Sequence, residues 1–251
     1  MKYPEVRNYI NGQFVAADLA AIDVFDPAAG LVISRVPMSG VRELDAAVAA
    51  AKRALPAWSA LPIKERVQVF FRYKALLERH IDELAALISE ENGKIDSEAR
   101  AEVQKAAELC EFACSLPQIA TGEVLEVSRG VECRVERFPV GIVASIAPFN
   151  FPNMVPHWSI PNAIALGNCF ILKPSEYVPL SAGRIAALLT EAGLPPGVFQ
   201  VVHGGRDVVE AICDHPDIGA VSFVGSTKTA KADRKSTRLN SSHVKRSRMP
   251  S

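Results

Sequence analysis

Paired cysteines, long apolar runs and a glycine-rich nucleotide motif are all missing from this sequence. Its 5 cysteines are odd in number and irregularly spaced, which argues against a disulfide framework. No apolar run is long enough to cross a membrane, and the first residues lack the apolar core of a signal peptide. Because 49% of the residues are nevertheless hydrophobic, we expect a cytoplasmic protein with a sizeable buried core and no membrane partner.

The cysteines and histidines also form no clear metal or catalytic pattern. Cys110 and Cys114 lie four residues apart on an expected helix, a spacing that suits metal ligation, but no pair of histidines accompanies them. We therefore favour two small buried hydrophobic residues over a metal site. His203 precedes two glycines and is best explained as part of a junction between a strand and a loop.

Three apolar runs have the pattern of strands of a parallel sheet, and the first two have the pattern of buried strands. They cover residues 140–148, 169–174 and 220–227, and the last breaks at a glycine. Ligands bind at the carboxyl ends of such strands, so the residues at these ends are the candidate site residues. They are Ala147, Phe149 and Asn150 on the first run, Lys173, Glu176 and Tyr177 on the second, and Gly225 and Ser226 on the third.

Each of these strand ends suits a particular chemistry. The neutral amide of Asn150 can stabilise negative charge on a carbonyl oxygen, although a lone Asn in a turn more often bonds the backbone. Lys173 can meet a ligand hydroxyl or phosphate, or be a solvated strand end. With Glu176 three residues later it can hold a ribose from two sides. A turn at Gly225 that opens a helix at Ser226 would offer N–H groups to a pyrophosphate without any GxGxxG motif.

The rest of the chain predicts an α/β domain in which strands and helices alternate as βαβ units. Hairpins are expected at residues 9–15, where Asn11-Gly12 is a strong turn signal, and at 24–34. An exposed strand or hairpin is expected at 122–138, and a strand at 198–202. Helical periodicity covers residues 39–55, 64–89, 97–116, 160–166 and 181–191.

Taken together, three segments resemble the cofactor-binding half of the aldehyde dehydrogenase superfamily, and within it the methylmalonate-semialdehyde dehydrogenase branch, which acylates coenzyme A. They are Ile146-Ala-Pro-Phe-Asn-Phe-Pro-Asn-Met-Val-Pro-His-Trp158, Ile171-Leu-Lys-Pro-Ser-Glu176 and Ser222-Phe-Val-Gly-Ser-Thr227. The likeness runs from about Tyr9 to Ala230. It implies a Rossmann-like parallel-sheet NAD-binding domain with N-terminal hairpins and helices, from a family whose full-length members form homo-oligomers, here expected to be a homotetramer.

The resemblance also assigns roles to individual residues. It makes Asn150 an oxyanion donor, and it places Lys173 and Glu176 on the adenosine ribose. The Glu176 carboxylate would repel the extra phosphate of NADP, so NAD is the expected cofactor. Tyr177, where relatives often have arginine, would flank the adenine. Lys105 stands where the methylmalonate branch has an arginine for the substrate carboxylate, and it keeps the charge but not the bidentate fork.

The functional expectation is NAD-dependent oxidation of methylmalonate or malonate semialdehyde to an acyl-CoA through a cysteine thioester, with coenzyme A as acyl acceptor. A succinate- or glutarate-type enzyme that does not acylate coenzyme A is the alternative. None of the five cysteines matches the family's nucleophile. We therefore expect residues 1–232 to be an incomplete NAD-binding domain, inactive alone, and a non-catalytic dinucleotide-binding module is the competing reading.

The last stretch of the chain is unusually basic, with seven Lys and Arg between Lys231 and Arg248 against the single Asp233. A disordered tail that contacts nucleic acid or an acidic surface is one explanation. We prefer another, because residues 233–251 resemble the translation of a sequencing-library adapter. We therefore expect these residues to form no part of the folded domain and expect no nucleic-acid partner.

Overall fold

The structure is a computed structural model, and it describes residues 1–16 and 18–225. Ser226 and the basic segment 233–251 lie outside the described residues, so the interpretations of both stay predictions. No helix in the described part of the chain is long and apolar enough to cross a membrane.

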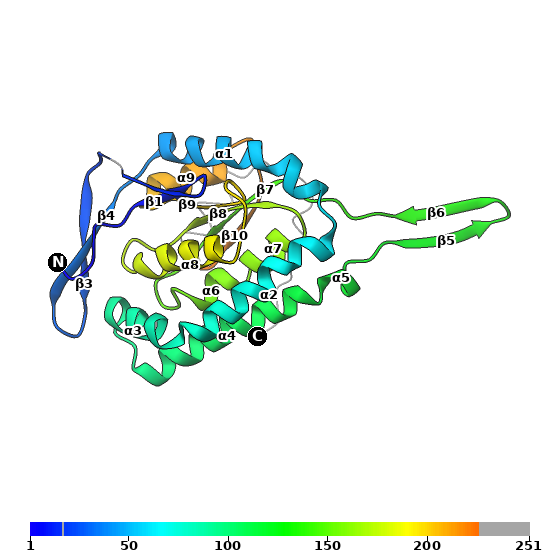
Figure 1. The fold of residues 1–251 in the computed structure, drawn as a ribbon. Coiled ribbons are helices and arrows are strands. Elements are labelled where there is room, and N and C mark those ends of the chain that lie inside the picture. The colour runs from blue at the N-terminus through cyan, green and yellow to red at the C-terminus, as the bar shows by residue number, and fades with distance from the viewer. Residues whose placement is uncertain (17, 226–251) are drawn as a thin grey trace, which may run out of the picture.

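A six-stranded sheet forms the centre of the molecule (Figure 1). Its strand order is β10 (Ile218–Phe223), β7 (Ile142–Ile146), β8 (Cys169–Lys173), β9 (Phe199–Val201), β1 (Asn8–Ile10) and β2 (Gln13–Val15). The first four strands are parallel, while β1 and β2 add an antiparallel hairpin to the edge. The predicted α/β fold with a parallel sheet is therefore confirmed.

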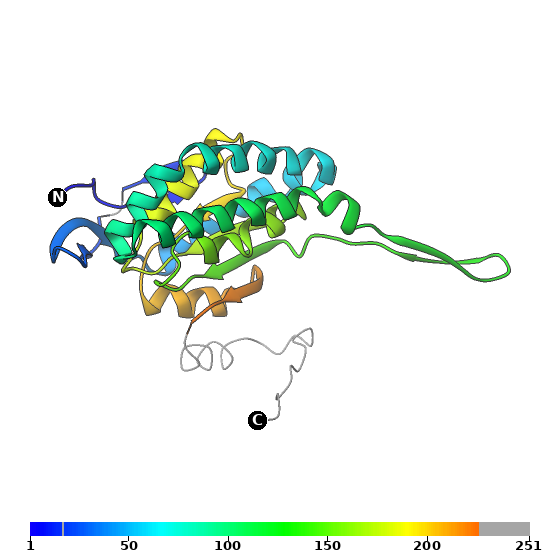
Figure 2. The same cartoon turned by 90° about the horizontal axis from the view of Figure 1, so that it is seen from below.

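Helices cover both faces of this sheet, which explains why its central strands read as continuous apolar runs. One face packs against α1 (Val41–Ala60) and α9 (Arg206–Asp214). The other is covered by α2 (Ile63–Arg79), α3 (Ile81–Asn92), α4 (Asp96–Cys114), α6 (Met154–His157), α7 (Ile160–Ala165) and α8 (Leu180–Glu191). In Figure 1 these two groups lie on opposite sides of the strands, and Figure 2 shows the molecule from the side of α2, α3 and α4. Along β7, Ile142 and Ala144 belong to the first core and Val143 to the second, the alternation expected of a strand.

The predicted hairpins are confirmed. At the first one, Asn11 and Gly12 both have positive φ, 53° and 81°, as a type I′ turn requires. The second consists of β3 (Ala21–Asp26) and β4 (Leu31–Pro37). The third consists of β5 (Glu123–Ser128) and β6 (Val131–Val135). It follows α5 (Leu116–Ile119), is exposed at every position, and projects from the body of the molecule (Figure 1).

One helix prediction is wrong. The apolar stripe over residues 64–89 predicts a single helix, but the structure divides it into α2 and α3 at His80, whose ψ of 19° departs from helical geometry. Periodicity cannot reveal this break, because Leu77 and Leu84 lie seven residues apart and keep both helices on the same core face. The helix is therefore interrupted at His80, although the apolar residues before and after it keep the spacing of one continuous stripe.

Gly93 ends α3 in the left-handed conformation, with φ at 83°, and a Cβ there would lie 2.9 Å from Pro27 Cγ. Gly93→Ala should therefore lower the free energy of unfolding by about 1–2 kcal/mol. Gly183→Ala is the matched control, since Gly183 lies inside α8 and its added methyl would meet only Phe14, at 3.8 Å. Urea unfolding should show that variant unchanged or more stable by about 1 kcal/mol. Equal losses in both variants would contradict this explanation of Gly93.

Candidate functional site

The carboxyl ends of three parallel strands meet at one edge of the sheet. Backbone hydrogen bonds join them there: Ala147 N–H donates to Lys173 O at 3.0 Å, and Val224 N–H donates to Ile146 O at 3.2 Å. The segments that follow β7, β8 and β10 are consequently neighbours. The candidate residues on these three segments, from Ala147 to Asn150, from Lys173 to Tyr177, and Gly225, are brought to one edge.

Lys173 and Glu176 form an ion pair at this edge. Lys173 Nζ lies 2.9 Å from Glu176 Oε2, and their side chains are 6% and 24% exposed. The ammonium is thus buried and fixed by the carboxylate, whereas the carboxylate keeps part of its surface open to a ligand. A fixed donor beside an accessible acceptor suits a pair of neighbouring hydroxyl groups, which can both accept and donate hydrogen bonds.

Phe149 and Tyr177 converge on a small cavity of about 230 Å³, which Phe25 and Asn92 also line. The Phe149 and Tyr177 side chains are largely exposed. Asn92 Nδ2 donates to the carbonyl oxygen of Phe149 at 2.8 Å and ties the loop after β7 to the end of α3. The structure thus adds an N-terminal strand, through Phe25 on β3, to the surroundings of the predicted cofactor residues.

A buried carboxylate holds the loop that carries Asn150. Glu102 Oε1 accepts hydrogen bonds from the N–H groups of Asn153 and Met154 at 2.7 and 3.0 Å. Its other oxygen accepts one from Lys94 Nζ at 2.5 Å. The same ammonium lies 3.7 Å from the centre of the Phe151 ring, a cation–π contact. Asn150 itself is exposed, so its amide is presented on a loop fixed directly behind it.

Beneath this loop lies a second buried polar chain. His157 Nδ1 lies 2.6 Å from the carbonyl oxygen of Asn153, and its Nε2 lies 2.8 Å from the Tyr73 hydroxyl. A carbonyl can only accept, so Nδ1 carries the proton and the Tyr73 hydroxyl donates to Nε2. Burial lowers the pKa of His157 to about 4, which keeps the ring neutral in this arrangement.

Lys105 lies apart from these contacts. It is on α4, one turn after Glu102, its side chain is 51% exposed, and its ammonium pairs with Glu108. Hydrogen bonds among the described residues connect Glu102, but not Lys105, to the loop of Asn150. The assignment of Lys105 to a substrate carboxylate therefore stays a prediction.

Sequence reasoning missed Glu102 and a second buried carboxylate, Glu91. Glu91 accepts hydrogen bonds from the N–H groups of Leu180 and Ser181 at 2.6 and 2.9 Å, and so caps α8 directly after the candidate loop. Burial raises the pKa of Glu91 to about 7. A signal was present for both, because each glutamate falls on the buried stripe of its own helix. A charged residue in such a stripe requires dedicated partners.

Three of the five cysteines are poorly suited to act as nucleophiles. Burial raises the pKa of Cys110, Cys114 and Cys169, which opposes formation of the thiolate. Cys133 lies on the exposed hairpin β5–β6. No group of His, Cys, Asp and Glu side chains among the described residues is arranged to hold a metal ion.

Known proteins resemble this chain closely in sequence and in structure. The model of the aldehyde dehydrogenase family matches residues 14–247. A malonate-semialdehyde dehydrogenase of Geobacillus kaustophilus is 50% identical over 228 residues, which are 90% of this chain and 47% of that protein. The chain therefore spans about half the length of the curated relatives it matches.

Two solved structures share the fold. A methylmalonate-semialdehyde dehydrogenase from Oceanimonas doudoroffii superposes with a TM-score of 0.91 at 43% identity, over 93% of this chain and 48% of the other. A putative methylmalonate-semialdehyde dehydrogenase from Sinorhizobium meliloti, in complex with NAD, gives 0.91 at 42% identity, over 94% and 48%.

Proposed function

Because this chain belongs to the aldehyde dehydrogenase family, we propose that the carboxyl edge of its sheet binds the adenosine half of NAD, with Lys173 and Glu176 on the ribose. The observation that carries the proposal is their ion pair, in which a buried ammonium stands beside a partly open carboxylate. Ala147, Phe149 and Gly225 supply the surrounding backbone, and Tyr177 supplies an aromatic surface for the adenine. The solved structure with bound NAD supports the choice of cofactor.

The charge of Glu176 gives the site its preference within this proposal. An additional phosphate on the ribose would bring negative charge against the carboxylate, so NADP should bind more weakly than NAD. Lys173 cannot offset this repulsion, because its ammonium is already paired with Glu176 at 2.9 Å.

Calorimetric titration of the chain with NAD and NADP tests this site. Lys173→Met, which keeps the apolar stem and removes the ammonium, should weaken NAD binding about tenfold or more. Glu176→Gln should reduce the difference between the affinity for NAD and the affinity for NADP. Lys64→Met removes the same charge from the exposed surface of α2 and should bind NAD as the wild type does. If Lys173→Met and Lys64→Met both bind like the wild type, the ribose assignment is wrong.

We further propose that a full-length enzyme containing this chain oxidises an aldehyde through a cysteine thioester, with bound NAD as the hydride acceptor. Within this chain, Asn150 would donate its side-chain amide hydrogen bond to the oxygen that becomes negative. Glu102 and Lys94 would keep the loop in place by the contacts described above. Asn150→Ala in such an enzyme should lower kcat about 10²–10³-fold, and a change in KM alone would contradict this role.

The proposed substrate is methylmalonate or malonate semialdehyde, because the similar proteins described above are named for these semialdehydes. Coenzyme A is the proposed acyl acceptor. Lys105 is our candidate for the substrate carboxylate. A succinate- or glutarate-type semialdehyde with water as acceptor is the alternative. Product analysis with and without coenzyme A separates them, since only the first reaction yields an acyl-CoA.

The exposed hairpin β5–β6 is the proposed contact for assembly into a homotetramer. The cytoplasm is the proposed compartment.

A second candidate function applies to this chain by itself, as a module that binds the dinucleotide without catalysing a reaction. It is favoured by the raised pKa values of Cys110, Cys114 and Cys169, which oppose formation of a nucleophilic thiolate at these three residues. NAD binding without NAD reduction in the presence of semialdehyde would support it.

A further inference from the structure

A second and larger cavity lies away from the candidate site. It has a volume of about 620 Å³, is open to solvent, and is lined by the N-terminal segment 3–7, by β2, and by the facing sides of α3 and α8. This volume is in the range of small-molecule sites. None of the residues assigned to NAD, to the oxyanion or to the substrate lines it.

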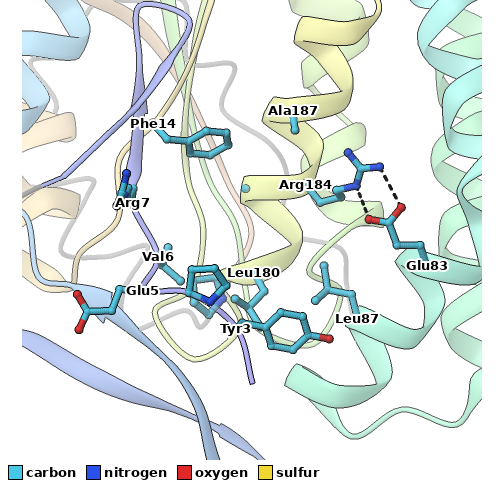
Figure 3. Close-up of a pocket in the computed structure, with 13 residues that line it drawn as sticks. Tyr3, Glu5, Val6, Arg7, Phe14, Glu83, Leu87, Leu180, Arg184 and Ala187 are labelled. Carbon is cyan, nitrogen blue, oxygen red and sulfur yellow. Dashed lines mark hydrogen bonds and ion pairs between the residues drawn. The ribbon is translucent and has the colours of Figure 1, made fainter. Parts of the chain in front are cut away.

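The walls of this cavity are mainly apolar. Figure 3 shows Phe14 and Ala187 at one end and Val6, Leu180 and Leu87 at the other. These side chains come from the N-terminal residues 6–14, from α3 and from α8, which are distant from one another in the sequence, so the cavity is a product of the tertiary fold.

Gly183 leaves the α8 side of the cavity open. It occupies the interior of α8, where glycine costs about 1 kcal/mol relative to alanine. A Cβ at this position would meet only the edge of the Phe14 ring, at 3.8 Å. A larger side chain would therefore extend into the cavity without colliding with the helix, which makes this position suitable for a blocking substitution.

Four charged side chains surround the apolar walls, and two of them neutralise each other. Arg184 is held by Glu83 through two hydrogen bonds of 2.6 and 2.9 Å. Glu5 lies 3.7 Å from Arg35, which also pairs with Asp23 at 3.3 Å. Arg7 is exposed, and no carboxylate of the described residues pairs with it. Figure 3 places Arg7 on the opposite side from the pair of Arg184 and Glu83. The cavity thus combines apolar walls with one arginine, Arg7, that no carboxylate of the described residues pairs with.

We propose that this cavity binds a small organic anion with a carboxylate head and an unbranched aliphatic body. The carboxylate would receive a bidentate pair of hydrogen bonds from the Arg7 guanidinium. The aliphatic part would lie along Val6, Phe14 and Leu180 and be removed from water there. A dianion finds no second free cation among the lining residues, and a neutral molecule leaves Arg7 unused.

The test is a calorimetric titration with octanoate, and with 1-octanol as its uncharged counterpart. Wild-type chain should bind octanoate at one saturable site. Arg7→Gln should weaken octanoate binding about tenfold or more while leaving binding of 1-octanol unchanged. Arg53→Gln removes an exposed arginine from α1, outside the cavity, and should bind octanoate as the wild type does. NAD should not compete with octanoate, because the two sites share no residue.

Gly183→Leu supplies an independent result, because it fills the cavity and also raises helix propensity. It should unfold in urea at or above the wild-type midpoint and should bind neither octanoate nor 1-octanol. Octanoate binding that does not saturate, equal affinities of the Arg7 and Arg53 variants, or unchanged binding by a folded Gly183→Leu would each overturn the proposal. It would also be overturned if sedimentation showed a wild-type dimer that Gly183→Leu dissociates, because a second copy would then occupy the cavity.

Discussion

Glu102→Ala should destabilise the protein by about 3–5 kcal/mol, the cost of leaving a buried charge without its partner. The Glu102 side chain is 1% exposed and that of Lys94 is 12% exposed. Removal of the carboxylate leaves the Lys94 ammonium and the N–H groups of Asn153 and Met154 without their acceptor. Urea unfolding with a constant m-value would measure the loss.

Glu108→Ala is the matched control, because it removes a carboxylate from the same helix at a side chain that is 62% exposed. An effect within about 0.5 kcal/mol is expected there. The double variant of Lys94 and Glu102 should be less destabilised than the sum of the two single variants, since no charge is then left alone. Equal losses at Glu102 and Glu108 would show that the buried carboxylate does not hold the loop of Asn150.

Stability should fall steeply in acid because two histidines are buried in the neutral form. Burial lowers the pKa of His157 to about 4 and, with a contribution from Lys173, that of His203 to about 3. An unfolded histidine titrates near 6.5. Between the two values the unfolded chain binds more protons than the folded chain, so stability is lost as the pH decreases through this window.

Glu91 acts in the opposite direction over part of the same range. Its pKa is raised to about 7 by burial, so its contribution is present at low pH and is lost as the pH rises from its unfolded value of 4.5 to 7. On unfolding, the two histidines each take up a proton and Glu91 releases one, so the net uptake is one proton. The expected loss is therefore about 3 kcal/mol between pH 6.5 and 4.5, and the slope steepens below 4.5.

Urea unfolding at several pH values checks this sum, and maximum stability should lie near pH 6.5–7. His157→Gln should reduce the proton uptake on unfolding by about one. The free energy of unfolding should then change with pH less steeply, by about 1.4 kcal/mol per pH unit. A flat profile between pH 6.5 and 4.5, or an unchanged slope in this variant, would contradict the burial of neutral histidine.

The strands and turns of this fold could be predicted from the sequence because their signals are local. The apolar runs that form β7 and β8 are buried on both faces of the sheet. Asn11-Gly12 forms the hairpin turn that this dipeptide predicts. Lys173 and Glu176 are three residues apart, so their pairing also required only local geometry.

Relations between distant segments could not be predicted in this way. The hairpin of β1 and β2 joins the main sheet through the single pairing of Tyr9 with Val201. Glu102 reaches Asn153 from another helix, and residues 3–7 line a cavity with α8. No periodicity along one segment encodes such contacts, because they depend on how complete elements pack. The helix break at His80 could not be predicted for another reason. The apolar residues of α2 and α3 pack into one core, so their spacing continues across the break.

We propose above that NAD binds at the edge formed by the ends of β7 and β8. Amide hydrogen exchange of the chain with and without NAD, followed by mass spectrometry of its peptides, tests this most directly. We expect protection in the segments 147–151 and 173–178, and no change in the segment 3–7 that borders the larger cavity. Protection confined to other segments, at NAD concentrations where calorimetry shows saturation, would contradict the account.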